Sequence, residues 1–267
     1  MKLRVLHLNV ERSKHTETVE NLLKEKMPEI VCLEESMKND ASKLASIFGY
    51  NLAFAPRVII EKENGEKDEE GSSILSKYPI KNVKQERYDD KKVEDLIVCK
   101  ENSILFKGVV RPKDRFLMRS NLLSVSIMKE GKEVTIATTH FPVVDHGTPG
   151  SPAHIFDHME EILDVEYMDI YLERLLSLIR RLNDPVIFTA DLNNQRGEYI
   201  YDTLAHELDD IVPSSVSSTI DPKIHRKGSE LNLCVDTIMV SPNISSDNFE
   251  IIEGVSDHKA LLVSLDI

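Results

Sequence analysis

The feature that most constrains this chain is the repeated placement of ionisable and amide side chains at the ends of apolar strands. Residues 260–265 have the apolar, β-branched character of a strand inside a sheet, and Ser256, Asp257 and His258 stand directly before them. A turn that satisfies loose backbone N–H groups explains one such arrangement. Because the arrangement recurs along the chain, we interpret it as a functional site.

The first predicted strand shows the pattern clearly. Along residues 3–10 the two-residue period of a strand places His7, Asn9 and Glu11 on one face. The later strands end in the same residue types, namely Glu34 and Glu35 on opposite faces, His140, and Asp191 and Asn193 on one face. Asp236 lies within an apolar strand, where a charge is costly unless it is paired.

The order of elements indicates a mixed α/β chain with antiparallel β content. Apolar periodicity predicts helices over residues 16–26, 40–48, 155–182 and 196–208, and strands over 3–10, 29–35, 50–56, 72–76, 102–110, 116–128, 133–140, 185–194, 233–241 and 259–267. The almost entirely charged stretch 61–70 is typical of a solvated loop or hairpin tip. No repeat or linker divides the chain, so we expect a single domain over residues 1–267.

Composition narrows the classes of partner. A net charge of −13 disfavours, without excluding, nucleic acid as the main substrate, because phosphate neutralisation usually requires a basic surface. No apolar run reaches the ~18–20 residues of a membrane span. The three cysteines lack zinc spacing and read as reduced core thiols of a cytoplasmic protein. We expect a monomer.

The residue types at the strand ends suit phosphoester hydrolysis. Carboxylates and carboxamides are the hard oxygen ligands that Mg²⁺ prefers, and histidines can transfer protons or hold a phosphate. An acidic chain also suits a site that collects a divalent metal ion.

In their order along the chain these residues resemble the endonuclease/exonuclease/phosphatase superfamily, which includes deoxyribonuclease I. The resemblance is carried by Asn9, Glu35, His140, Asp191-x-Asn193, Asp236 and Ser256-Asp257-His258, and by the stretches LRVLHLNV, PEIVCLEE, GSSILSKYPI, TADLNN and VDTIMVSP. It implies an α+β fold, a four-layer α/β/β/α sandwich of two packed mixed β-sheets with the site at one end.

The resemblance also implies a role for each matching residue. Glu35 matches the metal-binding glutamate of the family, while Glu11 and Asp257 fall at acidic positions on the metal side. Asn9 matches the asparagine that supports metal and phosphate. The implied cofactor is Mg²⁺ or Mn²⁺, bound as one ion or two.

The remaining matches imply proton transfer. His140 matches the histidine of the deoxyribonuclease and sphingomyelinase branches, and in its protonated form it would stabilise the transition state or protonate the leaving group. Asp191 and Asn193 match the pair that orients the attacking water and holds phosphate. Asp236 and His258 match a carboxylate–histidine dyad, and the sequence leaves open whether Asp191 or His258 is the general base.

We therefore expect a divalent-metal-dependent hydrolase that cleaves phosphoesters, with phosphodiesters favoured, by in-line attack of water. The alternatives are a nuclease acting on DNA or RNA, and a non-catalytic binding relative of the same fold. Among the arginines Arg57, Arg111, Arg119 and Arg196, we favour Arg196 as a substrate-binding residue because it closely follows Asn193. The loop 141–154, with His146 and His154, is the candidate for a specificity lid.

Overall fold

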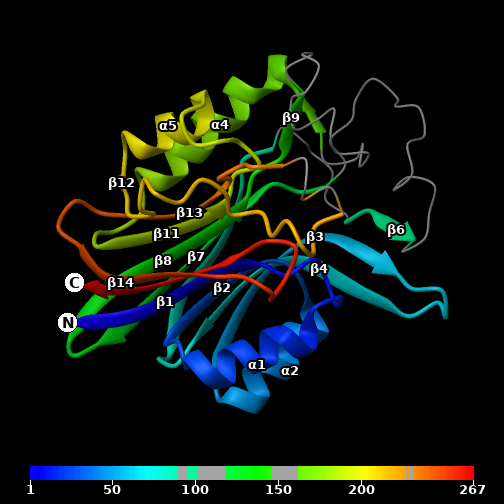
Figure 1. Cartoon of the computed structure of the whole chain (residues 1–267), viewed down its shortest axis with the longest axis horizontal. Coiled ribbons are helices and arrows are strands. Elements are labelled where there is room, and N and C mark those ends of the chain that lie inside the picture. The colour runs from blue at the N-terminus through cyan, green and yellow to red at the C-terminus, as the bar shows by residue number, and fades with distance from the viewer. Residues whose placement is uncertain (90–95, 101–117, 146–161, 227, 229–230) are drawn as a thin grey trace.

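Two β-sheets packed face to face form the centre of the protein (Figure 1). The computed structural model describes residues 1–89, 96–100, 118–145, 162–226, 228 and 231–267. Within these residues the first sheet has the order β14 (Ser245–Ile252), β15 (Ala260–Asp266), β1 (Lys2–Asn9), β2 (Ile30–Met37), β4 (Lys67–Ser76), β3 (Asn51–Glu61) and β6 (Val98–Lys100).

The second sheet contributes most of the strand ends that matter for the site. Its described strands run in the order β12 (Asp209–Asp210), β13 (Asp236–Val240), β11 (Val186–Asp191), β8 (Lys132–His140), β7 (Asn121–Lys129) and β5 (Ile80–Arg87). A small separate pair joins β9 (Val143–Asp145) to β10 (Ile162–Asp164). Both large sheets mix parallel and antiparallel neighbours.

Helices cover the outer face of each sheet. Helices α1 (Thr16–Lys26) and α2 (Lys38–Phe48) lie against the first sheet, and α4 (Val165–Ile179) and α5 (Tyr199–Ala205) lie against the second (Figure 1). The four-layer sandwich of two mixed sheets implied by the sequence resemblance is thereby confirmed.

The residues of β1 show why the sequence of a central strand is almost continuously apolar. Val5 belongs to the core between the two sheets, whereas Leu6 and Leu8 pack in the core beneath α1 and α2. Since both faces of the sheet are covered, apolar side chains are stabilised on both. A polar side chain on the inner face, such as His7, therefore stands out.

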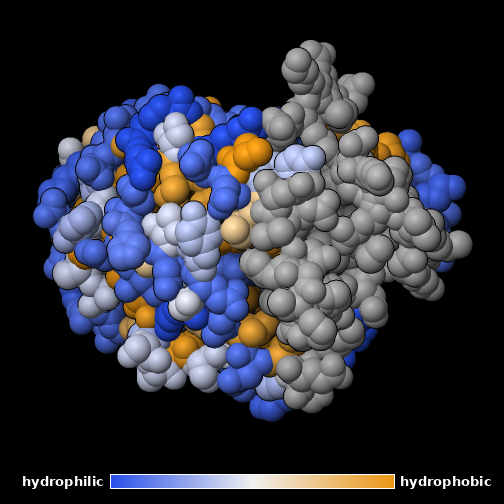
Figure 2. Space-filling view, turned by 90° about the horizontal axis from the view of Figure 1, so that it is seen from above, coloured by the Kyte–Doolittle hydropathy of each residue, from blue (hydrophilic) through white to orange (hydrophobic). Residues whose placement is uncertain are grey.

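The outer helical layer presents a largely hydrophilic surface. Seen from the side of α4 and α5, hydrophobic residues are scattered among polar ones in the visible part of the surface (Figure 2). Ile170 of α4, for example, remains exposed, whereas Leu172 and Leu175 of the same helix are buried. This is the amphipathic pattern expected of a helix that covers a sheet.

Two helix predictions require correction. The helix predicted over 155–182 runs only over Val165–Ile179 within the described residues, because 162–164 form strand β10, and residues 155–161 lie outside that part. The helix predicted over 196–208 is limited to Tyr199–Ala205, since 195–198 form a turn closed by the Glu198 N–H and the Gln195 carbonyl. The strand predicted over 102–110 also lies outside the described residues.

The charged stretch 61–70 is a hairpin tip only in part. Residues 62–66 connect β3 and β4, but the stretch continues into β4, where Asp68 and Glu70 are buried. The alternation of a strand turns these two carboxyl groups inward, which the charge run does not reveal. None of the helices in the described part of the chain combines the length and the hydrophobicity that a membrane span requires.

Candidate active site

Strand register places the residues predicted in the second sheet side by side. Asp191 at the end of β11 is paired in register with His140 of parallel strand β8 and with Asp236 of antiparallel strand β13. The register of the three strands thus places three ionisable side chains at neighbouring strand ends. They form one edge of the candidate site.

Asn9 connects this edge to the first sheet. Its Nδ2 donates hydrogen bonds to Glu35 Oε1 at 2.9 Å and to Asp191 Oδ2 at 3.0 Å. Asn9 ends β1, Glu35 belongs to β2 and Asp191 ends β11. One amide group therefore joins strands from both sheets, and the structure brings together the residues predicted from the pattern.

A β-bulge in β2 changes the expected direction of Glu34. The register between β2 and β4 shifts around these residues, and Glu35 has a positive φ of 51°. Glu34 accepts a hydrogen bond from the Thr138 hydroxyl of β8. Glu35 Oε1 lies 3.9 Å from Nδ1 of His140, which also belongs to β8. Both carboxyl groups face the second sheet, so the prediction of opposite faces is wrong.

Asp236 and His258 form a buried charged pair. His258 Nδ1 lies 2.8 Å from Asp236 Oδ2. Although burial opposes both charges, the charge of Asp236 raises the pKa of His258 well above its usual value, and the charge of His258 lowers the pKa of Asp236. The pair is therefore an imidazolium and a carboxylate.

The pKa of Asp191 shifts in the opposite direction to that of Asp236. Burial, together with the nearby negative charge of Asp236, raises the pKa of Asp191 to about 6. Its Oδ2 lies 3.8 Å from His258 Nδ1, and its Oδ1 accepts a hydrogen bond of 3.0 Å from the Asn193 backbone N–H. A carboxylate in this range can exchange protons near neutral pH.

His140 is neutral, contrary to the expectation from sequence. Burial and the positive charge of Arg57 lower its pKa well below the usual value. Asn193 Nδ2 donates to His140 Nε2 at 2.7 Å and to the Phe141 carbonyl at 2.9 Å, which assigns the ring proton to Nδ1. The side chain of Asn193 thus fixes the orientation of His140.

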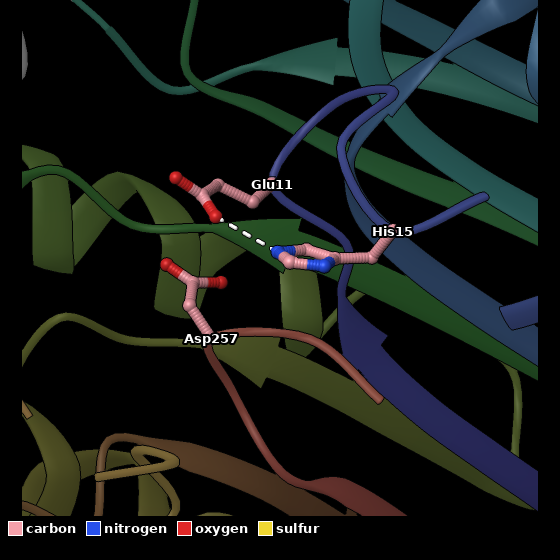
Figure 3. Close-up of side chains that lie close together, drawn as sticks. All are labelled: Glu11, His15 and Asp257. Atoms are coloured by element: carbon pink, nitrogen blue, oxygen red, sulfur yellow. Dashed lines mark hydrogen bonds and ion pairs between the residues drawn. The ribbon is translucent and has the colours of Figure 1, made fainter. Parts of the chain in front are cut away.

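A more open group lies at the rim, where the side chains of Glu11, His15 and Asp257 converge (Figure 3). Donor atoms of these residues all lie within 4.8 Å of one another, and His15 Nε2 is 3.0 Å from Glu11 Oε2. Glu11 does not continue β1 as predicted, because the strand ends at Asn9 and Glu11 has φ 46° in the turn that follows. All three residues are partly exposed.

The chemistry of this rim fits a divalent cation. Burial and the charges of Glu11 and Glu35 raise the pKa of Asp257 to about 6, which shows carboxylates repelling one another. A metal ion relieves such repulsion, and carboxylate oxygens are suitable ligands. A second group of donor atoms, from Asp191, Asp236 and His258, is fully buried, whereas the rim group is partly exposed. Both oxygens of Glu11 have partners, but one of these is the exposed Lys14 ammonium, which a cation would displace. The rim group is therefore the better cation site.

Arg196, predicted to bind substrate, makes its described side-chain contacts with the segment around β12 and with Tyr201, and with none of the other predicted site residues. Its Nη1 donates to the Pro213 carbonyl at 3.1 Å, and its Nη2 donates to the Val212 carbonyl and lies 3.0 Å from Asp210 Oδ2. The guanidinium therefore anchors the segment around β12. Sequence proximity to Asn193 is misleading here because the chain turns away after the strand.

Several residues near the site escaped the sequence analysis. His15 carries a weak signal, since it follows Glu11 by four positions. His225 has none, but its segment is tied to the site because the backbone N–H of Asp221 donates to the Asp257 carbonyl at 2.8 Å. Burial and the positive charge of His258 lower the pKa of His225 to about 4. The candidates Arg111, His146 and His154 lie outside the described residues.

Arg57 adds positive charge behind the site. This buried side chain lies 3.7 Å from Glu70 Oε1, and the Arg12 guanidinium lies 3.5 Å from the other oxygen of the same carboxylate. Although burial opposes ionisation, the positive charge of Arg12 and the hydrogen bond from Asn9 lower the pKa of Glu35. Glu35 is therefore ionised and available as a ligand.

The fold matches solved structures over the whole chain. A Bacteroides vulgatus endonuclease/exonuclease/phosphatase aligns with a TM-score of 0.68 and 15% identity, covering 100% of this chain and 99% of the other. Humanized D. rerio TDP2 aligns with a TM-score of 0.64 and 13% identity, covering 100% and 99%. A mannosyl-6-phosphatase of Bacteroides thetaiotaomicron aligns with a TM-score of 0.62 and 16% identity, covering 99% of this chain and 100% of the other. These identities establish similarity of fold.

Sequence comparison defines the family. No curated protein sequence matched the chain. The model of the Endonuclease/Exonuclease/phosphatase family, in contrast, matches residues 6–258, which include the strand ends described above. The chain therefore belongs to the endonuclease/exonuclease/phosphatase family.

Proposed function

We propose that this protein is a divalent-metal-dependent hydrolase of phosphoesters, with phosphodiesters as its favoured substrates. The observation that carries the proposal is the approach of Asp191, with a pKa raised to about 6, to within 3.8 Å of a positively charged His258. A proton acceptor thus stands beside a buried cation, as hydrolysis of an anionic ester requires.

Asp191 is the general base in this proposal. The carboxylate takes a proton from the attacking water, and Asn9 holds it in place through a hydrogen bond of 3.0 Å to Oδ2. His258 remains an imidazolium and stabilises negative charge on the phosphate oxygens in the transition state. Its high pKa makes it a poorer base at neutral pH than Asp191.

Asn193 and His140 position the ester. The two side chains are joined at 2.7 Å, and the neutral His140 ring carries its proton on Nδ1, which lies 3.9 Å from Glu35 Oε1. Glu11 and Asp257 would hold Mg²⁺ or Mn²⁺ at the rim, with His15 as an additional nitrogen ligand and the ionised Glu35 as a further carboxylate. When bound, the ion would supply Lewis-acid stabilisation of charge on the phosphoryl group.

Hydrolysis of bis-p-nitrophenyl phosphate with Mg²⁺, with Mn²⁺ and with EDTA tests this proposal. We expect turnover that depends on the metal and falls ~10²–10⁴-fold in His258→Ala. The monoester p-nitrophenyl phosphate serves as the comparison substrate. If the folded protein hydrolyses neither ester with either metal, the proposal is overturned and the non-catalytic alternative is favoured.

Nucleic acid is a disfavoured substrate in this proposal. One of the similar structures is D. rerio TDP2 in complex with a single-stranded DNA product, but the net charge of this chain is −13. A protein that neutralises many phosphates loses affinity steeply with salt. We expect KM for the preferred ester to change little between about 50 and 200 mM salt, in contrast to the ~10³–10⁵-fold loss of a protein with six to ten phosphate contacts.

A further inference from the structure

His7 is a buried ionisable side chain that the proposed mechanism does not use. It lies in β1, paired in register with Cys32 of β2 and Leu261 of β15, and its side chain is 0% exposed. The preceding inward positions of this strand, Leu3 and Val5, belong to the apolar core between the sheets. An imidazole in the same row costs free energy unless a partner compensates for the lost water.

The partner of His7 is Asp236, on the opposite sheet. His7 Nε2 lies 3.2 Å from Asp236 Oδ1, while His258 Nδ1 lies 2.8 Å from Oδ2 of the same carboxylate. The carboxylate of Asp236 therefore lies between two imidazole rings, with one oxygen for each. His7 and Asp236 are both 0% exposed, so water does not compete for this contact.

The hydrogen bonds define which nitrogen of His7 carries the proton. An ionised carboxylate can only accept hydrogen bonds, so Nε2 of His7 and Nδ1 of His258 must both donate. Among the described residues, His7 Nδ1 has no hydrogen-bond partner. The geometry therefore places a proton on Nε2 of His7.

We propose that His7 is a positioning residue, which fixes the Asp236 carboxylate so that its other oxygen stays aligned with His258. The inference rests on the proposed function, because it assigns His7 a part in the same hydrolysis. Without the His7 donor, Asp236 Oδ1 is buried and unpaired, and the carboxylate is free to rotate toward His258. The orientation of the His258 ring toward substrate is then lost.

Substitution of His7 separates positioning from a purely structural role. We expect His7→Leu to lower kcat for bis-p-nitrophenyl phosphate by about 10–100-fold, the range typical of partners behind the reacting groups, with KM changed less than about threefold. His7→Gln retains an N–H donor on a side chain of similar reach and should recover most of kcat. If His7→Leu does not fold, His7→Met serves as the second removal variant.

Cys32→Ala provides the matched control. Cys32 is buried beside His7 in the neighbouring strand, and its thiol is not bonded to Asp236. This variant should lower the melting temperature while it leaves kcat unchanged. In addition, His7→Leu should have no further effect on kcat in an Asp236→Asn background, because residues that act through one group are not additive. Full additivity in this cycle would overturn the inference.

A measurement without substrate distinguishes failure of this inference from failure of the proposed function. The Nδ1–H proton of His258 should give a downfield NMR signal, which shifts or broadens in His7→Leu and is restored in His7→Gln. An unchanged signal in folded His7→Leu overturns the role of His7 even if the protein is inactive. If wild-type turnover is observed and His7→Leu keeps full kcat, the inference fails while the proposed function stands.

Discussion

The two halves of the candidate site differ in how completely the polypeptide satisfies them. Asp191, Asp236 and His258 are buried and bonded to one another or to their neighbours, so their orientations are fixed within the protein. Glu11, His15 and Asp257 lie partly exposed at the rim, and burial together with the charges of Glu11 and Glu35 raises the pKa of Asp257. The first half is preorganised, whereas the second half is open to a ligand.

This difference explains why the two halves should respond differently to mutation. Substitution in the buried half removes a group whose geometry is already fixed, so we expect the loss mainly in kcat. Substitution at the rim removes a ligand from a site that is incomplete alone, so we expect the loss mainly in metal affinity.

The largest effect should come from Asp191→Asn. The amide cannot accept a proton from water, so we expect kcat to fall ~10²–10⁴-fold. In the wild type, kcat/KM should rise with pH around about 6, where Asp191 becomes ionised, and this limb should disappear in the variant. pH–rate profiles of both proteins with bis-p-nitrophenyl phosphate check this, provided that their melting temperatures are similar. A variant that keeps both its turnover and the rise of kcat/KM around pH 6 would show that Asp191 is not the base.

Asp257→Asn should have the next largest effect, on metal binding. The variant replaces a charged oxygen ligand by a neutral one, and we expect Mn²⁺ affinity to weaken by about 10–100-fold. Calorimetric titration measures this directly. In the wild type, Mn²⁺ at 100 times Kd should increase the free energy of unfolding by about 2.7 kcal/mol. The melting temperature should rise accordingly, and EDTA should reverse the rise. Equal affinity in the two proteins would place the cation elsewhere.

His15→Gln should alter metal preference more than metal affinity. An imidazole nitrogen favours transition metals over Mg²⁺, which prefers oxygen ligands. We therefore expect the ratio of Mn²⁺ to Mg²⁺ affinity to fall about three- to tenfold in this variant. Glu17→Gln, at an exposed position in the first turn of α1 and outside the donor group, is the control. An unchanged ratio would remove His15 from the ligand set.

Glu34, buried against Ser72 and Thr138, should affect stability and not activity, through a dependence of stability on pH. Burial raises the pKa of Glu34 to about 7, so the folded state binds a proton that the unfolded state, with an ordinary pKa, has released. This contribution is full below about pH 4.5 and is lost as pH rises through about 7. Urea unfolding from pH 4.5 to 8 should show a decline of about 1–3 kcal/mol, reduced in Glu34→Gln. An identical slope in both proteins contradicts the assignment.

Much of this architecture follows from local sequence patterns. Helix α1 has the predicted bounds Thr16–Lys26, because an apolar stripe is followed at once by Met27 in a left-handed conformation and by Pro28. Asn9 and Asp191 were placed correctly at strand ends because their apolar neighbours define the strands. Strands β5 and β14 escaped prediction since both are sheet edges with largely polar, exposed residues.

The details of the site depend on contacts that the sequence does not encode locally. The direction of Glu34 is set by a bulge, and the protonation of His140 by burial beside Arg57. The orientation of Arg196 is decided by a turn and by Asp210. Each of these is a tertiary effect, which overrides the period of a strand or the spacing of a motif.

The bonds from Asn9 to Asp191 and from His7 to Asp236 both cross from one sheet to the other. A partly folded molecule in which each sheet has formed but the two have not docked holds only separate fragments of the candidate site. Such a molecule should be inert however regular its secondary structure is. Recovery of turnover during refolding should therefore coincide with the final docking step, and enzymatic activity would serve as a reporter of completed assembly.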